Sequence, residues 1–558
     1  MTIRSLLEET VAKTPGALAL VYKRDGKWVE RTYAQFGDGV RAVAEGYGTL
    51  FNLVPQHDHA SIILSNGPEW IESYLACAGA GVAVVPVDPK LHAEEVAWIL
   101  GNSEAAVVTT DSAHLPMVAE LQPSLPALRG IVIVGETDVK DVNGVPVVPY
   151  SSLARAPENG EKAWFDANVA RPEDVASLIY TSGTTGKPKG AMLTHANFTA
   201  DAEGAYGAFS DPITQKDSFF VVLPLFHAFS FCTNFVVPMM RGCAMKFNES
   251  LRTIGDDMRA LKPSVVMAVP LLVEKIYDKV RDKIDKSFFG RLLMKLGLGR
   301  VIGRSVVKGL GGNIMCIIVG GAPCPIHVLE GFRALGIPLL QGYGLTECAP
   351  VVSIAGPKAE ARIGTIGYKL TNIEVRIADP NEQGIGELQI RGPITMKGYY
   401  KNEEATRETI DPEGWLCTGD LAELAPDGLL SIRGRKKALI VNREGKNIYP
   451  EEVENRIASD KIVADCIVVG YKVGNVEGDG ERVGAIVHPD PDLYAEANGC
   501  EPPSPAALEK WTVRRVQELC ADLADYKRPR KVKVVCEPLE RTSIGKVRRV
   551  AYKDTLDE

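Results

Sequence analysis

The sequence lacks any pair of cysteines with C-x-x-C spacing, and it has no cluster of cysteine and histidine with the spacing of metal ligands. Its eleven cysteines are scattered from Cys77 to Cys536. Because their number is odd, free thiols in a reducing compartment are the simplest interpretation. A structural zinc site is therefore not expected.

The sequence also lacks an uncharged apolar run of about 18 residues, the length that a transmembrane helix needs. Its N-terminal stretch, MTIRSLLEETVAKTPG, mixes charges into the apolar residues and has no signal-peptide core. There is no excess of positive charge, since 63 basic and 71 acidic residues give a net charge of −8. We therefore expect a cytoplasmic protein that does not bind nucleic acid.

Short apolar runs alternate with helical patterns through most of the first 430 residues. The run at Glu69–Gly81 is typical of a helix. Five runs are predicted as strands: Ala60–Leu64, Val82–Val87, Ser264–Val269, Ile314–Val319 and Ile337–Gln341. This alternation predicts an α/β fold in which helices cover mostly parallel sheets.

The pattern changes near Ser431–Glu454, where a basic cluster and a glycine-containing loop precede a helix start at Pro450. Two apolar strand patterns, a helical pattern near Ala507–Leu523 and the segment KVKVV follow. Such a set is sufficient for a small α+β domain. We predict an N-terminal domain at residues 1–436 and a C-terminal domain at residues 437–558.

The segment Lys286–Lys308 has six basic residues, no acidic residue and many apolar ones. One interpretation is a patch that contacts a membrane surface, at the inner face of the cell membrane. The other is a pair of helices packed on the domain, joined at Gly297 and Gly299.

The stretch YTSGTTGKPKG, Tyr180–Gly190, is not a Walker A motif. Thr181 stands where that motif has its first glycine, and Pro188 replaces the serine or threonine that would bind magnesium. The residues after the loop, GAMLT, have a strand pattern instead of a helix pattern. Backbone N–H groups, hydroxyls and two lysines nevertheless predict a mobile loop that binds a polyphosphate.

This stretch resembles the signature loop of the acyl-adenylate-forming superfamily, which includes acyl-CoA synthetases, luciferases and peptide-synthetase adenylation domains. Other motifs of that superfamily follow in order: PLFH (Pro224–His227), VGGAP (Val319–Pro323), QGYGLTE (Gln341–Glu347), GELQIRGPITMKGYY (Gly386–Tyr400), GWLCTGD (Gly414–Asp420), GRKK (Gly434–Lys437) and RTSIGKVRR (Arg541–Arg549). The amino-acid sequences of three segments, QGYGLTE, KNIYPEEVE and VPLLVEKIYDKV, are most similar to those of bacterial long-chain fatty acyl-CoA synthetases.

The resemblance implies a large N-terminal domain with a β-barrel-like subdomain and a mobile C-terminal domain. It also implies two half-reactions, in which a carboxylate attacks the α-phosphorus of MgATP and the thiol of CoA then displaces AMP. A fatty carboxylate is already ionised near pH 7, since carboxyl pKa values lie at about 4–5. The first step therefore needs positioning and charge neutralisation instead of a general base.

Residue by residue, the resemblance implies a nucleotide site and a magnesium site. The residues implied to bind ATP or AMP are Thr181, Ser182, Gly183, Thr184, Thr185, Lys189, Gly321, Ala322, Pro323, Gln341, Gly342, Tyr343, Thr346, Asp420, Arg435 and Lys546. Tyr343 would stack on the adenine, and Asp420 would accept hydrogen bonds from the ribose with support from Arg435. Glu347 and Thr184 would bind magnesium, and Lys546 would be the adenylation lysine.

The resemblance also implies where the acyl group and CoA bind. Residues implied to line the acyl site are His227, Phe229, Phe231, Ala268, Val269, Val319 and Gly320. Lys437 occupies the position of the hinge about which the C-terminal domain rotates. Gly445 and Lys446 would then approach the thioester site. The sequence departs from the usual pattern at Ala438, where the family has aspartate, and at Glu444, in a loop that is usually glycine-rich.

We predict a fatty acyl-CoA synthetase for long or medium chains, with ATP, Mg²⁺ and CoA as cofactor and co-substrates. Alternatives are a fatty acyl-AMP ligase that serves an acyl carrier protein, a CoA ligase for an aromatic or other acid, and a catalytically inactive nucleotide-binding homologue. No obvious insertion lies between Asp420 and Lys446, which favours CoA as the acceptor. A homodimer is left open.

Overall fold

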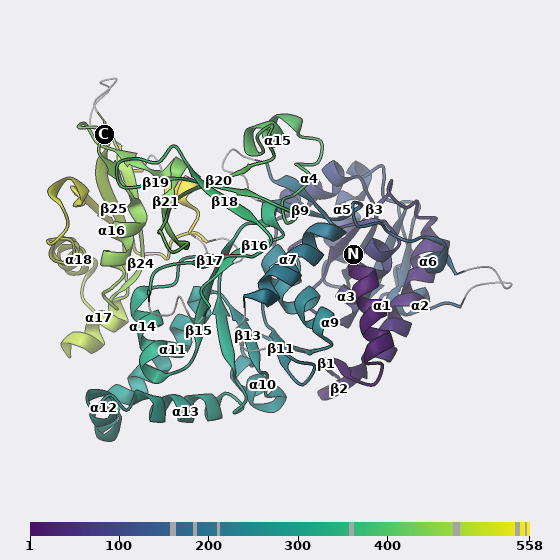
Figure 1. Ribbon diagram of the computed structural model, residues 1–558, viewed down its shortest axis with the longest axis horizontal. Helices are drawn as coiled ribbons and strands as arrows, with labels where there is room; N and C mark the ends of the chain where they lie inside the picture. Colours follow the sequence, from purple (N-terminus) through teal and green to yellow (C-terminus); the bar gives the residue numbers. More distant parts are fainter. Residues whose placement is uncertain are drawn as a thin grey trace.

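The computed structural model of the chain describes residues 1–156, 163–181, 187–208, 213–356, 362–472, 480–541, 547–552 and 555–557. In these ranges two large sheets form the N-terminal body, and a separate small sheet follows near the C-terminus (Figure 1).

The larger sheet has 13 strands within the described ranges. In spatial order they are β18 (Glu374–Ala378), β19 (Ile385–Arg391), β20 (Leu416–Leu424), β21 (Leu429–Arg435), β17 (Gly367–Lys369), β16 (Val351–Ile354), β15 (Leu339–Gly344), β14 (Cys316–Val319), β13 (Val265–Ala268), β11 (Ser218–Val221), β12 (Ala244–Phe247), β1 (Leu18–Arg24) and β2 (Lys27–Thr32). The strands from β15 to β1 are parallel, and β2 is antiparallel.

The second sheet has eight strands among the described residues. They are β10 (Lys189–Thr194), β9 (Val175–Thr181), β4 (Ala83–Pro86), β3 (His59–Ile63), β5 (Ala105–Asp111), β6 (Gly130–Val134), β8 (Val145–Pro149) and β7 (Asp141–Val142). The strands from β9 to β8 are parallel, whereas β10 and β7 are antiparallel edge strands. The predicted mostly parallel α/β architecture is confirmed.

Helices cover both faces of these sheets. In the N-terminal body they are α1 (Ile3–Lys13), α2 (Tyr33–Phe51), α3 (Pro68–Gly79), α4 (Ala93–Ser103), α5 (Leu115–Leu121), α6 (Trp164–Ala167), α7 (His195–Gly207), α8 (Ala228–Phe231), α9 (Val237–Arg241), α10 (Ile254–Leu261), α11 (Pro270–Lys286), α12 (Phe288–Lys295), α13 (Gly299–Gly309), α14 (Ile326–Leu335) and α15 (Glu403–Thr409). Neighbouring residues of one strand point to opposite faces of the sheet. Ile62 packs in the hydrophobic cluster that contains residues of α3, and Ile63 packs in the cluster that contains residues of α4.

The region predicted to resemble a β-barrel is an antiparallel ladder that continues the parallel part of the larger sheet. It begins where β15 pairs antiparallel with β16 and passes through β17, β21, β20 and β19. It ends at β18, which pairs only with β19 among the described strands, so this ladder is open.

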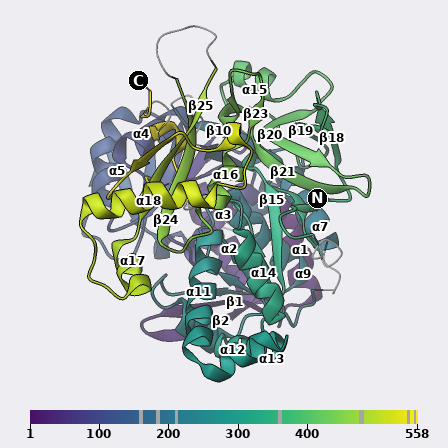
Figure 2. The same cartoon turned by 90° about the vertical axis from the view of Figure 1, so that its left-hand side faces the viewer.

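The C-terminal residues form a small α+β unit, as predicted. Its elements are β22 (Ile440–Val441), β23 (Asn447–Ile448), α16 (Pro450–Ile457), β24 (Val463–Tyr471), β25 (Arg482–Pro489), α17 (Pro491–Asn498), α18 (Pro505–Leu519) and β26 (Lys531–Val534). Helices α16 and α18 pack on the sheet around Val453, Val468 and Val516, and α18 crosses the front of this unit in Figure 2. The last strand of the larger sheet along the chain, β21, ends at Arg435, and the 3-10 turn η5 (Lys436–Ala438) follows it. The boundary between the two domains at residue 437 stays a prediction.

None of the helices among the described residues combines the length and the apolar composition needed to cross a membrane.

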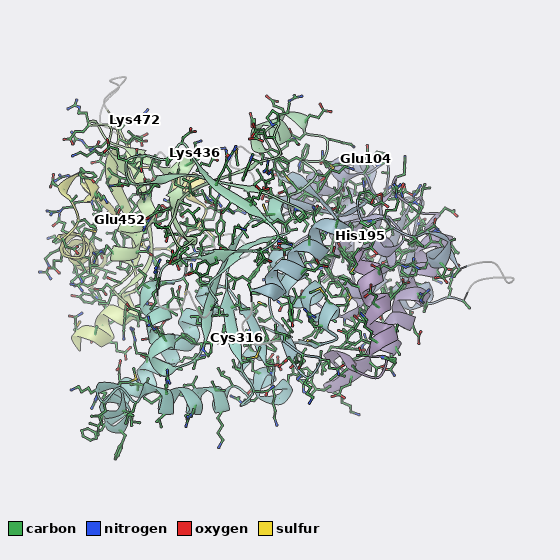
Figure 3. All side chains as sticks on the ribbon, viewed as in Figure 1. Glu104, His195, Cys316, Lys436, Glu452 and Lys472 are labelled. Carbon is green, nitrogen blue, oxygen red and sulfur yellow. The ribbon has the colours of Figure 1, made fainter. Side chains whose placement is uncertain are left out.

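His195, the first residue of α7, is fully buried inside the N-terminal body (Figure 3). Its Nδ1 accepts a hydrogen bond from the Ile3 N–H at 3.3 Å, and its Nε2 bonds the Ala78 carbonyl at 3.1 Å. Burial lowers the pKa of His195 from 6.5 to about 4.

The unfolded chain therefore binds a proton at this histidine below about pH 6.5, whereas the folded chain does not until about pH 4. We expect His195 to lower the free energy of unfolding by about 3 kcal/mol as the pH falls through this window. Urea unfolding of the wild type and of His195→Gln at several pH values measures this. Parallel stability curves for the two proteins would contradict the expectation.

Candidate functional site

Four neighbouring parallel strands of the larger sheet end at one edge, and each is followed by a segment that the sequence predicts to be functional. Strand β11 is followed by the segment that reaches His227, and β13 is followed by Val269. Strand β14 leads into Gly320–Pro323, and β15 itself carries Gln341–Tyr343. In open α/β sheets, ligands bind outside the carboxyl ends of the strands.

The register of these strands places predicted site residues beside one another. Ala268 of β13 is the partner of Val319 of β14, and Val319 is also the partner of Gln341 of β15. Ala268 and Val319 are buried, so their side chains are part of the core at this edge. The structure therefore brings predicted acyl and nucleotide residues together.

Phe229 and Gly320, two residues predicted to line the acyl site, are in direct contact. A Cβ atom on Gly320 would lie 3.0 Å from the Phe229 ring, so a larger residue here would displace that ring. Val269 lies next to them, 3.9 Å from the position that a Cβ of Gly321 would take. His227 lies just before α8, with its ring 4.5 Å from that of Phe226.

Phe231, also predicted to line the acyl site, lies deeper in the body. Its ring is 1% exposed and packs against Tyr74 at 4.4 Å and Phe198 at 4.8 Å between centroids. These contacts place Phe231 in an aromatic core cluster, and its role at the acyl site stays a prediction.

The residues predicted for adenine and ribose form one hydrogen-bonded group. The Tyr343 hydroxyl donates to Asp420 at 2.5 Å, and Arg435 Nε pairs with the other carboxylate oxygen at 2.7 Å. Asp420 and Arg435 are cross-strand partners on β20 and β21. Burial and the adjacent Asp420 carboxylate raise the pKa of Tyr343 well above its usual value, so this hydroxyl stays a donor.

Gln341 and Thr346 flank Tyr343 in the chain. The Gln341 side-chain oxygen is buried and has no hydrogen-bond partner within the described ranges, so it can accept a hydrogen bond from a ligand. Thr346 begins the 3-10 turn η4 (Thr346–Cys348). The other predicted nucleotide residues Gly342, Ala322 and Pro323 are all at least partly exposed.

The strands on both sides of the predicted phosphate loop form an antiparallel pair. Thr181 ends β9, Lys189 begins β10, and these two residues are register partners. The strand at Lys189–Thr194 confirms that no helix follows the loop directly. Ser182, Gly183, Thr184 and Thr185 lie outside the described residues.

Tyr399, for which the sequence predicts no role in the site, connects this hairpin to Glu347. Its hydroxyl donates to Glu347 Oε1 at 2.7 Å, and Lys189 Nζ lies 5.4 Å from the centre of its ring. A bridge between Tyr399 and Ala191 fixes the segment on β10. The motif that ends in Tyr399-Tyr400 contains no sign of this contact, because Glu347 lies 52 residues earlier.

Glu347 is a suitable oxygen ligand for a hard cation such as Mg²⁺. Its second predicted partner, Thr184, is outside the described residues. Within the ranges that are described, no group of three or more histidine, cysteine, aspartate or glutamate side chains could hold a metal ion. A cation bound by Glu347 would therefore need further ligands other than these side chains, such as the predicted Thr184 hydroxyl or phosphate oxygens.

The predicted hinge and CoA residues lie at and beyond the end of the larger sheet. Lys437 is in η5, next to Lys436, whose Nζ pairs with Glu387 of β19 at 2.8 Å (Lys436 is labelled in Figure 3). Gly445 has a positive φ of 72°, which favours glycine there. Lys446 pairs with Glu444 at 2.9 Å and lies 4.8 Å from the Tyr526 ring, both within the C-terminal unit.

Lys546 lies outside the described residues, but residues on both sides of it are placed. Arg541 and Val547 form an antiparallel bridge, and Arg541 pairs with Asp465 of β24. These contacts attach the flanks of Lys546 to the C-terminal sheet.

Comparison with known proteins agrees with the motifs. The sequence profile of the AMP-binding enzymes matches residues 7–400, and the profile of their C-terminal domain matches residues 452–546. The long-chain-fatty-acid–CoA ligase FadD15 of Mycobacterium bovis is 31% identical over 527 residues, which are 86% of this chain and 84% of that protein. The long-chain-fatty-acid–CoA ligase 6 of Rattus norvegicus is 30% identical over 79% of this chain and 67% of its own length.

A solved structure has the same fold. The O-succinylbenzoate coenzyme A synthetase MenE from Bacillus subtilis, in complex with AMP, superposes with a TM-score of 0.75 at 25% identity over 98% of each chain. The resemblance and the fold class predicted from the motifs are confirmed. Since the first profile matches well over half of the sequence, the chain belongs to the family of AMP-binding enzymes.

Proposed function

We propose that the protein is an ATP-dependent acid–thiol ligase that activates a long- or medium-chain fatty acid as acyl-AMP, releases pyrophosphate and then forms acyl-CoA and AMP. The observation that carries the proposal is the convergence of predicted nucleotide and acyl residues at the carboxyl ends of β11, β13, β14 and β15. The similarity to long-chain-fatty-acid–CoA ligases over most of the chain supports it.

In the first half-reaction, the residues of this chain bind and orient MgATP. Asp420, held by Tyr343 and Arg435, accepts hydrogen bonds from the ribose hydroxyls. Lys189 and the loop that begins at Thr181 hold the β- and γ-phosphates. Glu347 and Thr184 would hold Mg²⁺, which neutralises phosphate charge when it is bound. The substrate carboxylate is ionised at pH 7 and attacks without a general base.

In the second half-reaction, the C-terminal domain rotates about Lys437 and presents its other face to the adenylate. This movement withdraws Lys546 and lets Gly445 and Lys446 approach the site where the CoA thiol displaces AMP. The described chain between Asp420 and Lys446 has only short connections between β20, β21, β22 and β23. Without an insertion here to impede rotation, CoA is favoured over a carrier protein as the acceptor.

The chemistry of the acyl site favours an aliphatic chain. Phe229, Val269 and the core residues Ala268 and Val319 offer only apolar side-chain atoms, and the Phe229 ring packs directly on the backbone of Gly320. Apolar walls bind a hydrocarbon chain through the hydrophobic effect. An aromatic acid remains the second candidate, because a ring could occupy the same apolar space.

The experiment that tests this proposal measures pyrophosphate release against a panel of carboxylic acids, with and without CoA. The expected result is release with fatty acids and CoA-dependent formation of acyl-CoA. Release without any thioester would instead indicate an acyl-AMP ligase, and a preference for aromatic acids would indicate the second candidate. No release with any acid would exclude the enzymatic function.

Tyr399→Phe tests the placement of Glu347. Removal of the hydroxyl that donates to Glu347 Oε1 costs one hydrogen bond to a charged group, worth about 1.5 kcal/mol. We expect adenylation at limiting Mg²⁺ to fall about tenfold and the Mg²⁺ requirement to rise. Pyrophosphate release as a function of Mg²⁺ concentration measures both. The neighbouring Tyr400→Phe is the control, and equal Mg²⁺ dependence in the two variants would contradict this role of Tyr399.

A further inference from the structure

Helices α12 and α13 lie together at one edge of the molecule (Figures 1 and 2). They expose a group of large apolar side chains. The Phe288 and Phe289 rings are 69% and 74% exposed, more than those of the other phenylalanines in the described chain. Four further apolar residues are exposed here: Leu292, Leu296, Leu298 and Val301. We refer to Lys286–Lys308 as the α12–α13 surface.

The exposed apolar residues of α12 and its C-cap residue Leu296 share one face of that helix. At about 100° per residue, Phe288, Phe289, Leu292 and Leu296 fall within an arc of about 100°. Leu293 and Met294, which point to other directions of the wheel, are partly buried. Helix α12 therefore turns one side toward the body and keeps a continuous apolar strip in solvent.

Helix α13 is fixed to the body by two glycines. A Cβ on Gly299 would lie 2.3 Å from the Ala334 carbonyl oxygen, and one on Gly303 would lie 1.9 Å from that of Leu335. The backbone of α13 thus lies directly against the end of α14, closer than any side chain would allow. One face of this segment packs on the domain, as expected for a pair of packed helices, and the other face remains exposed.

The charged residues of the α12–α13 surface are all basic. All six basic residues of the segment are exposed, and the segment contains no acidic residue. Within the described ranges none of the six forms an ion pair, and Arg291 bonds only the Asp285 carbonyl oxygen. On α13, Arg300, Arg304 and Lys308 lie with Val301 within an arc of about 100° of the helical wheel. The combination is an aromatic anchor on α12 beside a cationic face on α13.

We propose that the α12–α13 surface docks on a lipid bilayer that contains anionic lipids. Phenylalanine and leucine side chains of an amphipathic helix insert at the boundary of headgroups and acyl chains, and nearby lysine and arginine contact anionic headgroups. A second copy of the chain fits this surface poorly. In a two-fold dimer the same patch meets itself, which would bring two sets of six positive charges together.

The position of the surface connects it to the acyl site. Helix α11 begins directly after Val269, a predicted acyl residue, and ends at Lys286, where the α12–α13 surface begins. Its 17 residues span about 25 Å. The inference concerns a partner of the protein and does not depend on which acid is the substrate.

Co-sedimentation with phosphatidylcholine vesicles, with and without about 30% phosphatidylglycerol, tests the proposal. We expect the full-length protein to bind the anionic vesicles and to lose binding as salt is raised. Phe288→Ser with Phe289→Ser should lower the partition coefficient at least about tenfold. Replacing Arg291, Lys295, Arg300 and Arg304 with glutamine should remove the preference for phosphatidylglycerol.

Two controls make the test specific. Val54→Ser with Val169→Ser removes exposed apolar residues elsewhere, and Lys510→Gln with Arg514→Gln removes exposed charges on α18; neither should change binding. Pyrophosphate release from a water-soluble acid should be unchanged in every variant, so failure of docking is distinguishable from failure of the proposed function. Unchanged binding of the phenylalanine variant would overturn the proposal, and so would a solution dimer that this variant dissociates.

Discussion

Replacing Lys546 with alanine is expected to lower pyrophosphate release about a thousandfold while leaving thioester formation from supplied acyl-AMP within about threefold. As the carboxylate attacks the α-phosphorus, negative charge accumulates between the two groups, and a lysine ammonium that bridges them stabilises this charge. Loss of one such preorganised donor typically costs two to three orders of magnitude in rate. The second half-reaction needs no such bridge. The CoA thiol attacks the acyl carbon of acyl-AMP and displaces AMP, so the carboxylate no longer has to approach the α-phosphate.

The two half-reactions are measured separately on the same preparation. Pyrophosphate release reports the first, and acyl-CoA formation from synthetic acyl-AMP reports the second. Lys510→Ala, an exposed lysine of α18 in the same domain, is the matched control and should leave both rates unchanged. Since Arg541 and Val547 hold the flanks of residue 546 on the C-terminal sheet, the substitution should not alter the domain. An equal loss of both half-reactions would contradict the assigned role.

The sequence predicts the core strands of the fold well, because their apolar runs are bounded by glycine, proline and polar residues. The run Val82–Val87 corresponds to β4 (Ala83–Pro86), and the predicted helix start at Pro450 is the first residue of α16. Pairing between distant segments was not predictable. Strand β1 lies beside β12, more than 200 residues later, and no local pattern specifies such a neighbour.

The same distinction applies to the candidate site. Motifs place Gln341, Asp420 and Glu347 in the site one at a time, since each lies in a recognisable local context. Contacts between motifs depend on three-dimensional packing, and so the bond from Tyr399 to Glu347 appears only in the structure. Phe229 and Phe231 are two residues apart in the sequence, yet one ring touches Gly320 and the other is in the core.

The exposed strip on α12 is a second feature that the sequence alone could not predict. Its composition is equally suitable for a packed helix and for a surface helix, because both need apolar residues at helical spacing. Only the tertiary contacts decide which face is covered. The close approach of Gly299 and Gly303 to α14 covers one face of α13, and nothing within the described ranges covers Phe288 and Phe289.

Replacing Asp420 with alanine is expected to lower kcat/KM for ATP about a hundredfold to a thousandfold. The change removes the proposed acceptor for the ribose hydroxyls and also leaves Arg435 and the buried Tyr343 hydroxyl without their carboxylate. Removing one partner from a buried, charge-assisted group costs about 3–4 kcal/mol, which corresponds to this range. Asp420→Asn keeps an acceptor oxygen and should lose less, about tenfold to thirtyfold.

A comparison of ATP with 2′-deoxy-ATP separates ribose binding from a structural effect. If Asp420 accepts a hydrogen bond from the 2′-hydroxyl, the wild type should prefer ATP by about tenfold, and Asp420→Ala should lose that preference. Asp427→Ala, an exposed carboxylate that pairs with Arg362 beside β21, is the control and should keep it. A general distortion of the site would lower activity with both nucleotides and preserve their ratio. A preserved ratio in Asp420→Ala would therefore remove Asp420 from the ribose site, whatever the size of the loss in rate.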